Sequence, residues 1–201
     1  MMGKFQKGFT LIELLIAVAI FVGFIALGAN AVLEIMRAET KADVMRKTQT
    51  QTRYILETIL REARVAEGEL AKNRVRKAHA FKFLNEGEVE LYGTIGDDAK
   101  YLKIIDTDFE AGQPVVSKKL FYLEDGVLKM EIEEEGTFDL NDKDELIIKK
   151  FSLEGSYLPL SLEEPPFLKI TLKAETPGKE KKKYFERAEI EITSGATPRS
   201  Y

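Results

Sequence analysis

The order of hydrophobic and polar residues sets apart the beginning of the chain. Residues 9–29 are almost all apolar, and Glu13 is the only charged residue between Phe9 and Leu33. A helix over this run would extend roughly 30 Å, which is the thickness of the hydrocarbon layer of a bilayer. The run therefore predicts a membrane-spanning helix near the start of the chain.

Two glycines, Gly23 and Gly28, interrupt the apolar run. Glycine is a poor helix former, so the helix would unwind most easily at these positions. Alternatively, the missing side chains let neighbouring helices pack closely in lipid. The sequence leaves both interpretations open.

A second helical pattern follows the apolar run. In residues 44–66, mostly apolar or small residues recur at spacings of three and four, as on one face of a helix. This stripe consists of Val44, Thr48, Gln51, Ile55, Ile59, Ala63 and Ala66. We expect it to pack on a sheet of the same chain, because Thr48 and Gln51 are too polar for the alternative, a coiled coil with a partner only. No proline precedes Pro114, so one helix can run through both patterns and end at Gly68.

Beyond residue 78 the hydrophobic period changes to two, which is the pattern of short strands. The predicted strands cover residues 79–84, 88–93, 101–105, 120–123, 127–132, 145–153, 167–174 and 184–192. Glu124-Asp125-Gly126 separates two of them as a hairpin turn. A long helix followed only by antiparallel strands predicts an α+β fold, with the helix laid across a β-meander.

The composition limits the classes of function. Of the 201 residues, 44% are hydrophobic and 32% are charged, which suffices for one ordinary domain beside the apolar helix. The net charge of −4 offers no basic surface for a phosphate backbone, so we expect no nucleic-acid partner. The absence of cysteine excludes disulfides, thiolate metal sites and thiol catalysis.

The carboxylate inside the apolar run requires an explanation. An acid at the centre of a membrane helix costs on the order of 3 kcal/mol, and less near the end of the span, so such a residue usually has a function and a partner. The run contains no Lys, Arg or His that could pair with Glu13. Lys4 and Lys7 precede it, and the positive-inside rule then keeps the N-terminus in the cytoplasm and exports the rest. A cleaved secretory signal, which has a shorter apolar core, and a plain single-span anchor are the alternatives, and neither explains the acid.

The apolar run opens with the segment Gly8-Phe9-Thr10-Leu11-Ile12-Glu13-Leu14. This segment resembles the processing motif of type IV pilins and type II secretion pseudopilins. The resemblance implies that a prepilin peptidase cuts between Gly8 and Phe9 and methylates the new N-terminus at Phe9. It also implies that Lys4 and Lys7 belong to the basic leader and that Glu13 is the glutamate on which assembly depends.

Cleavage would create a free amine at Phe9 that the precursor does not have. In a filament of parallel helices, Glu13 of an incoming subunit can meet the amine of a neighbour already in place. Because a buried charge without a partner is costly, insertion is favoured only where the two charges meet. The pair would thus set the register of assembly, and processing would control it.

The resemblance also implies a domain organisation and a location. Residues 1–8 would be the leader, 9–30 the transmembrane half of the helix, 31–70 its exported amphipathic half, and 71–201 the soluble antiparallel β domain. The protein would cross the inner (cytoplasmic) membrane once, with a cytoplasmic N-terminus and an exported C-terminal domain, and then enter a periplasmic or extracellular filament.

The order and spacing of the strands loosely resemble minor pseudopilin J and the W-type minor pilins. We therefore predict a minor pilin-like subunit that initiates or caps a filament, with prepilin peptidase and other minor and major pilins or pseudopilins as partners. The pseudopilin at the extreme tip characteristically lacks the acid, so Glu13 argues against that role. An adhesin or binding domain on the same signal, or an anchored enzyme, are the alternative functions.

The predicted domain shows no pattern of a catalytic or cofactor site. His79, the only histidine, begins a predicted strand and is expected to be structural, and the chain has no nucleophile motif and no glycine-rich phosphate loop. The acidic residues 139–145 are expected to form a solvated loop. A calcium site there would be irregular, because Lys143 and Asp144 stand where an EF-hand needs an oxygen ligand and a glycine. Four further acids are expected to face water on an edge strand: Glu131, Glu133, Glu134 and Glu135.

Overall fold

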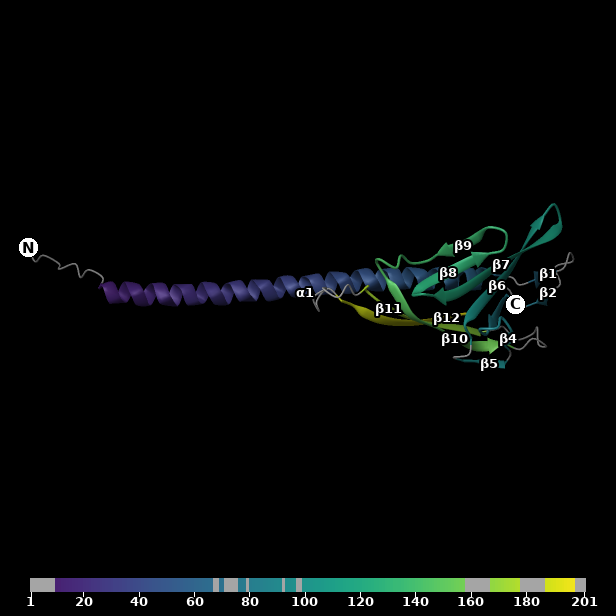
Figure 1. The fold of residues 1–201 in the computed structure, drawn as a ribbon. Coiled ribbons are helices and arrows are strands. Elements are labelled where there is room, and N and C mark those ends of the chain that lie inside the picture. The colour runs from purple at the N-terminus through teal and green to yellow at the C-terminus, as the bar shows by residue number, and fades with distance from the viewer. Residues whose placement is uncertain are drawn as a thin grey trace, which may run out of the picture.

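The computed structural model describes residues 10–66, 69–70, 76–78, 80–91, 93–96, 99–157, 167–177 and 187–197. One helix, α1 (Leu11–Val65), enters a β-rich domain with its C-terminal part, while its N-terminal part extends away as a bare rod (Figure 1). Its 55 residues correspond to about 80 Å. The predicted α+β fold is confirmed: a long N-terminal helix, apolar at its start, is packed on antiparallel sheets in a pilin-like arrangement.

The helix α1 is continuous because residues 11–65 contain no proline and its apolar half is rich in leucine and alanine. It passes through Gly23 and Gly28 without a break, and an added Cβ at either would meet no atom within 4 Å. The isolated chain therefore shows no unwinding at these glycines. The helix ends at Val65, earlier than the predicted Gly68, because Ala66 is buried and turns to ψ 128°.

The described strands form three antiparallel sheets. The smallest pairs β1 (Glu69–Leu70) with β2 (Arg76–Ala78). The largest has the order β4-β3-β6-β7-β8-β9 and is mostly a meander; in chain order its strands are β3 (Phe81–Leu84), β4 (Glu90–Leu91), β6 (Tyr101–Glu110), β7 (Gln113–Glu124), β8 (Val127–Ile132) and β9 (Gly136–Asp139). The third has the order β12-β11-β10-β5; its strands are β5 (Gly93–Ile95), β10 (Ile147–Tyr157), β11 (Phe167–Glu175) and β12 (Glu189–Ala196).

The C-terminal part of α1 lies against both larger sheets, contacting β11 and β12 of one and β6 of the other. Five members of the predicted stripe are buried as expected: Thr48, Ile55, Ile59, Ala63 and Ala66. Three buried residues were missed, because a face packed between two sheets is wider than a single seam: Thr52, Leu56 and Leu60. The helix thus packs on its own domain, and the alternative of a coiled coil with a partner only is wrong for this part.

The predicted hairpin turn between β7 and β8 is confirmed. Asp125 and Gly126 both have positive φ, 49° and 82°, as a two-residue turn that matches the strand twist requires. A second turn of the same kind, Ala111-Gly112, joins β6 to β7, with φ of 50° and 77°. The sequence did not indicate this turn, because alanine rarely adopts positive φ.

Two strand predictions are wrong, and the strand β9 was not predicted. Residues 88–93 do not form one strand; β4 and β5 replace it and belong to different sheets. The strand that carries Glu131 is not an edge strand, because β8 pairs with β7 on one side and β9 on the other. The prediction missed β9 because its four residues are all exposed and show no alternation. His79 lies outside the described residues.

Candidate assembly site on the N-terminal helix

Glu13 lies in the first turn of α1, where Thr10 caps the helix in an extended conformation (φ −77°, ψ 151°). The Thr10 hydroxyl accepts a hydrogen bond from the Glu13 backbone N–H at 3.3 Å. In return, Glu13 Oε2 accepts one bond from the Thr10 backbone N–H and one from its hydroxyl, both at 2.9 Å. This reciprocal arrangement is a capping box, which satisfies amide groups that the helix start leaves without partners.

The cap uses one oxygen of the Glu13 carboxylate. Oε1 receives no hydrogen bond from the residues that the structure describes, whereas an ionised carboxylate can accept about four. The same side chain can therefore hold the helix start through Oε2 and offer Oε1 to a donor on a second chain. A threonine three residues before a glutamate is a readable capping signal, yet sequence reasoning assigned no role to Thr10.

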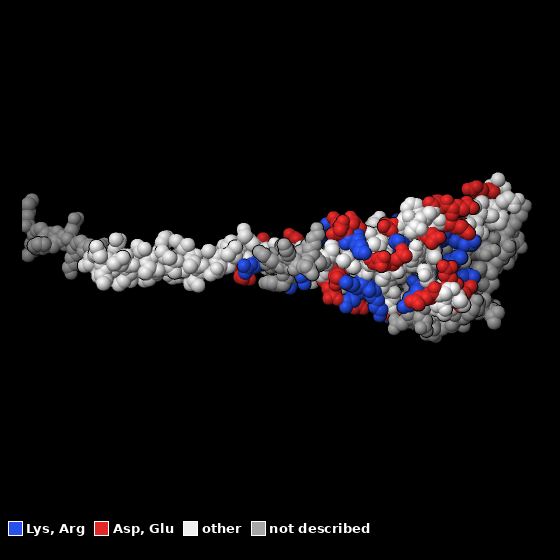
Figure 2. Space-filling model, in the orientation of Figure 1, with Lys and Arg blue, Asp and Glu red and all other residues white. Residues whose placement is uncertain are grey.

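The surroundings of Glu13 are apolar and uncovered. Its neighbours Leu11, Ile12, Leu14 and Leu15 are all more than half exposed, and α1 has no buried residue before Thr48. After Glu13 the helix has no charged residue until Glu34. On the face shown in Figure 2 the apolar half of the rod is white, whereas the domain surface carries both signs of charge. Among the described residues, α1 is the one helix long and apolar enough to cross a membrane. An apolar helix without a protein covering is suited to lipid or to other helices.

The remaining predicted site residues, Lys4, Lys7, Gly8 and Phe9, lie outside the described residues. The first helical residue is Leu11, so the predicted scissile bond between Gly8 and Phe9 precedes the helix in the chain. Of the five predicted residues, the structure thus places only Glu13.

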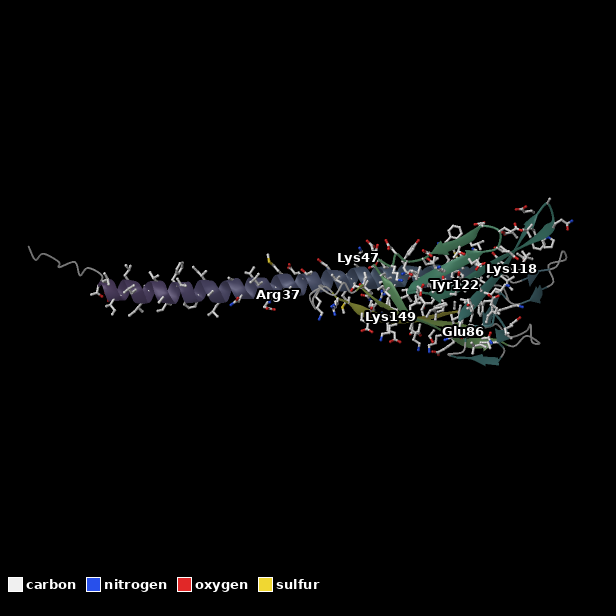
Figure 3. The ribbon with its side chains drawn as sticks, viewed as in Figure 1. Arg37, Lys47, Glu86, Lys118, Tyr122 and Lys149 are labelled. Atoms are coloured by element: carbon white, nitrogen blue, oxygen red, sulfur yellow. The ribbon has the colours of Figure 1, made fainter. Side chains whose placement is uncertain are left out.

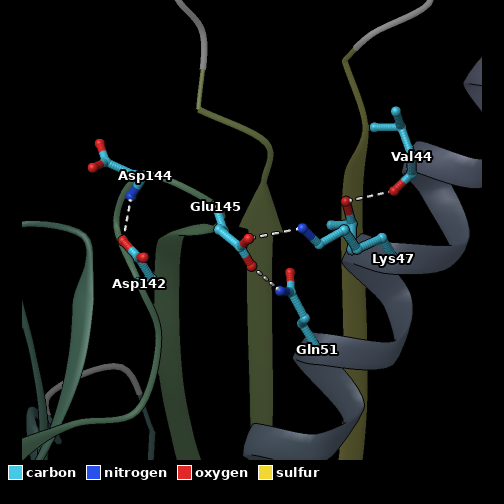
Figure 4. A network of polar contacts seen from close by, with 7 residues as sticks. Val44, Lys47, Gln51, Asp142, Asp144 and Glu145 are labelled. Atoms are coloured by element: carbon cyan, nitrogen blue, oxygen red, sulfur yellow. Dashed lines mark hydrogen bonds and ion pairs between the residues drawn. The ribbon is translucent and has the colours of Figure 1, made fainter.

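A second polar cluster fixes the helix to the domain where the bare rod ends (Figures 3 and 4). Glu145, just before β10, accepts from Lys47 Nζ at 2.9 Å and from Gln51 Nε2 at 2.7 Å. The hydrogen bond from the Lys47 ammonium, with that from Gln51, lowers the pKa of the Glu145 carboxyl. Glu145, in the acidic stretch of residues 139–145, therefore connects α1 to the segment just before β10.

The acidic stretch of residues 139–145 also contains Asn141, which is buried. Its carbonyl oxygen accepts from the Leu128 backbone N–H at 2.7 Å, and its amide donates to the Leu146 carbonyl at 2.7 Å. The expected solvated loop is thus wrong at Asn141, although residues 142–144 are exposed. In the part of the chain that the structure describes, no three His, Asp or Glu side chains are grouped so that they could hold a metal ion.

Comparison with known families gives one match. The family described as "Prokaryotic N-terminal methylation motif" matches residues 3–22, which include Glu13 and the capping residue Thr10. The comparisons with curated proteins and with solved structures give no match. The motif supports a type IV pilin-like chain that is processed by a prepilin peptidase and assembles into filaments, a structural rather than a catalytic role. Together with the apolar N-terminal helix, it indicates anchoring in a membrane.

Proposed function

We propose that this chain is a minor pilin-like subunit, a minor pseudopilin or minor pilin, of a type II secretion or type IV pilus machine. A prepilin peptidase would cut between Gly8 and Phe9 and methylate the new amine of Phe9, and Lys4 and Lys7 would belong to the removed leader. The observation that carries the proposal is the placement of Glu13: a capped carboxylate at the start of an exposed apolar stretch of helix that has no other charge before Glu34, within the matched motif.

Assembly would depend on the charge of Glu13. Cleavage leaves a cationic amine at Phe9, and the amine of a neighbouring subunit can donate to the Glu13 oxygen that the capping box leaves open. Charge-assisted hydrogen bonds are stronger than neutral ones and gain further strength where water is scarce. Parallel helices would then settle in the register that brings amine and carboxylate together.

The proposed topology follows the distribution of charge along α1. Residues 9–30 would lie in the inner membrane with the N-terminus in the cytoplasm, residues 31–70 would continue outside it, and residues 71–201 would form the exported domain. The helix is continuous through the first of these boundaries, and its residues on both sides of it are exposed. A single rigid rod would therefore connect the membrane to the domain.

The assignment as a minor subunit rests on the domain. Two larger sheets of six and four strands pack with the end of α1. This is more β structure than a thin, many-copy subunit needs, and it favours a subunit that initiates or caps the filament. The strand order and the β7–β8 hairpin further favour a relationship with minor pseudopilin J or W-type minor pilins.

Mass spectrometry of the protein purified from its native host tests the proposal. The expected N-terminal peptide begins at Phe9 and carries one added methyl group. In a chain with Gly8→Leu, the leader should remain and the precursor should stay in the inner membrane. An intact leader in the unmodified chain, or a new N-terminus other than Phe9, would overturn the proposal.

A further inference from the structure

The part of α1 that crosses the domain leaves one face in solvent. Arg53, Glu57, Arg61 and Arg64 follow each other at spacings of four, four and three, so they form a stripe on one side of the helix. All four are exposed, and the Arg61 side chain is 72% exposed. The stripe lies opposite the buried face of α1 and points away from the core.

The stripe is cationic, although the chain as a whole has a net charge of −4. Three arginines stand beside one glutamate. Arg53 and Arg64 have no ion-pair partner among the described residues, and Arg61 lies 3.9 Å from Glu62, whose carboxylate is bonded to Lys119. The charges of Arg53 and Arg64 are therefore available to a second molecule, and Arg61 is contacted only at 3.9 Å by a carboxylate that Lys119 also binds.

Tyr54 lies beside the stripe and is 71% exposed. A recess of 210 Å³ separates it from Leu140 and Leu146, in the loop before β10. A second recess, of 380 Å³, runs along the stripe towards Ser194 of β12. Exposed tyrosine and arginine side chains beside recesses have the composition of binding hot spots, where aromatic and guanidinium groups anchor a partner.

The position along the rod identifies the kind of partner. Arg53 lies about 35 Å along the helix from residue 29, where the apolar run ends. Electrostatic attraction between exposed charges is screened over about 8 Å at physiological ionic strength. Anionic lipid headgroups are therefore out of reach, whereas the exported part of an adjacent subunit would lie at this height.

We propose that Arg53, Tyr54, Arg61 and Arg64 form a docking surface for an acidic segment on a neighbouring filament subunit of a different kind. This inference rests on the proposed function, because it takes the neighbour to be part of the same filament. The arginines span about 17 Å along the helix, so the partner segment presents several carboxylates over that length. An apolar or aromatic side chain of the partner fills a recess beside Tyr54.

Photo-crosslinking of the full chain in its native host tests this surface. The probe is p-benzoylphenylalanine in place of Tyr54, and mass spectrometry identifies its adducts in the isolated filament fraction. We expect an adduct with another filament subunit, on a peptide rich in Asp and Glu. Substituting Glu for all three arginines should lower the adduct yield by about tenfold, which corresponds to ~1.4 kcal/mol of binding free energy.

Two controls accompany the charge reversal. Substituting Lys for the three arginines should retain most of the adduct, because the charge persists. The same probe in place of Phe138, an exposed aromatic residue on β9, should give adducts that the arginine substitutions leave unchanged.

An adduct yield at position 54 that charge reversal does not alter would overturn the docking surface, as would an adduct with lipid or with a second copy of this chain. The filament fraction distinguishes this failure from failure of the proposed function. A chain that enters the filament without an adduct at position 54 contradicts the docking surface alone. A chain that is absent from the filament contradicts the subunit role.

Discussion

Thr10 and Glu13 bind each other in both directions at the start of α1, the hydroxyl accepting from the Glu13 amide and the carboxylate accepting from both donors of Thr10. The helix start and the only charge of the apolar run are therefore one structural unit. The carboxylate is hydrogen-bonded within a single chain, because Thr10 supplies two donors. Its second oxygen remains for assembly.

The charge of Glu13, rather than its shape, should decide incorporation. Glu13→Gln keeps the size of the side chain and can still accept from Thr10, but it cannot form an ion pair with an amine. We expect processing as in the unmodified chain and a fall of about tenfold in the mature protein found in filaments, since hydrogen bonds to charged groups are markedly stronger. Fractionation with quantitative immunoblotting measures both quantities.

Glu13→Asp is the matched control, because it retains the charge with a shorter reach, and it should incorporate better than Glu13→Gln. Equal incorporation of Glu13→Gln and the unmodified chain would show that the soluble domain alone directs entry into the filament.

The hydroxyl of Thr10 should stabilise the first turn of the helix. Thr10→Val removes the acceptor for the Glu13 amide at nearly constant size, and losing such a cap costs about 1 kcal/mol. We expect amide exchange in the first turn of α1 to become about fivefold faster in detergent micelles. Hydrogen exchange measured by mass spectrometry reports this directly. Thr10→Ser retains the hydroxyl and should exchange like the unmodified chain; equally fast exchange in both variants would contradict the capping role.

The contact between Glu145 and Lys47 should make the stability of the domain depend on pH. The pKa of Glu145 is lower in the folded chain than its ordinary value, first because of the hydrogen bond from Lys47 and then because of that from Gln51. The contact therefore stabilises the fold fully above the ordinary carboxyl pKa of about 4.3, and this contribution is lost as pH falls through the lower folded value.

Thermal melting of the full chain and of Glu145→Gln, from pH 7 down to pH 3, measures this dependence. The unmodified chain should melt at the higher temperature at pH 7, and the difference should shrink as the pH falls below about 4. Lys173 and Glu189 form a similar exposed pair, which both proteins retain, so its titration cancels in the difference. A melting difference that stays constant over this range would contradict the contact.

Much of the fold could be predicted because the sequence marks it locally. The spacing of neighbouring residues predicts the apolar run, the buried face of α1 within residues 44–66 and the Glu124-Asp125-Gly126 turn. The division of the strands between two sheets could not be predicted, because β4 and β5 are adjacent in the chain and the pattern of a strand does not name its partner. The exposed strand β9 likewise has no pattern of its own.

The candidate site was predicted unevenly for the same reason. Glu13 is conspicuous in the sequence because charge inside an apolar run is costly, and its bond to Thr10 is local and readable. The contact between Glu145 and Lys47 joins residues far apart in the chain, so no local sequence pattern indicates it. The acidic composition of residues 139–145 is equally compatible with a wholly solvated loop.

Two glycines in equivalent turns allow one contact to be isolated. Gly126 and Gly112 have similar positive φ, 82° and 77°, so alanine at either position adopts a strained backbone that costs about 1–2 kcal/mol. A Cβ at Gly126 would also lie 2.9 Å from the Ile147 side chain, whereas a Cβ at Gly112 would meet nothing within 4 Å. Gly126→Ala should therefore lower the free energy of unfolding by about 1 kcal/mol more than Gly112→Ala, because the crowded β10 strand must shift. Chemical denaturation of the domain in detergent-solubilised full chain, followed by tyrosine fluorescence, gives both values. Equal losses would mean that β10 yields to the added methyl group, and a larger loss at Gly112 would contradict the packing of the turn against Ile147.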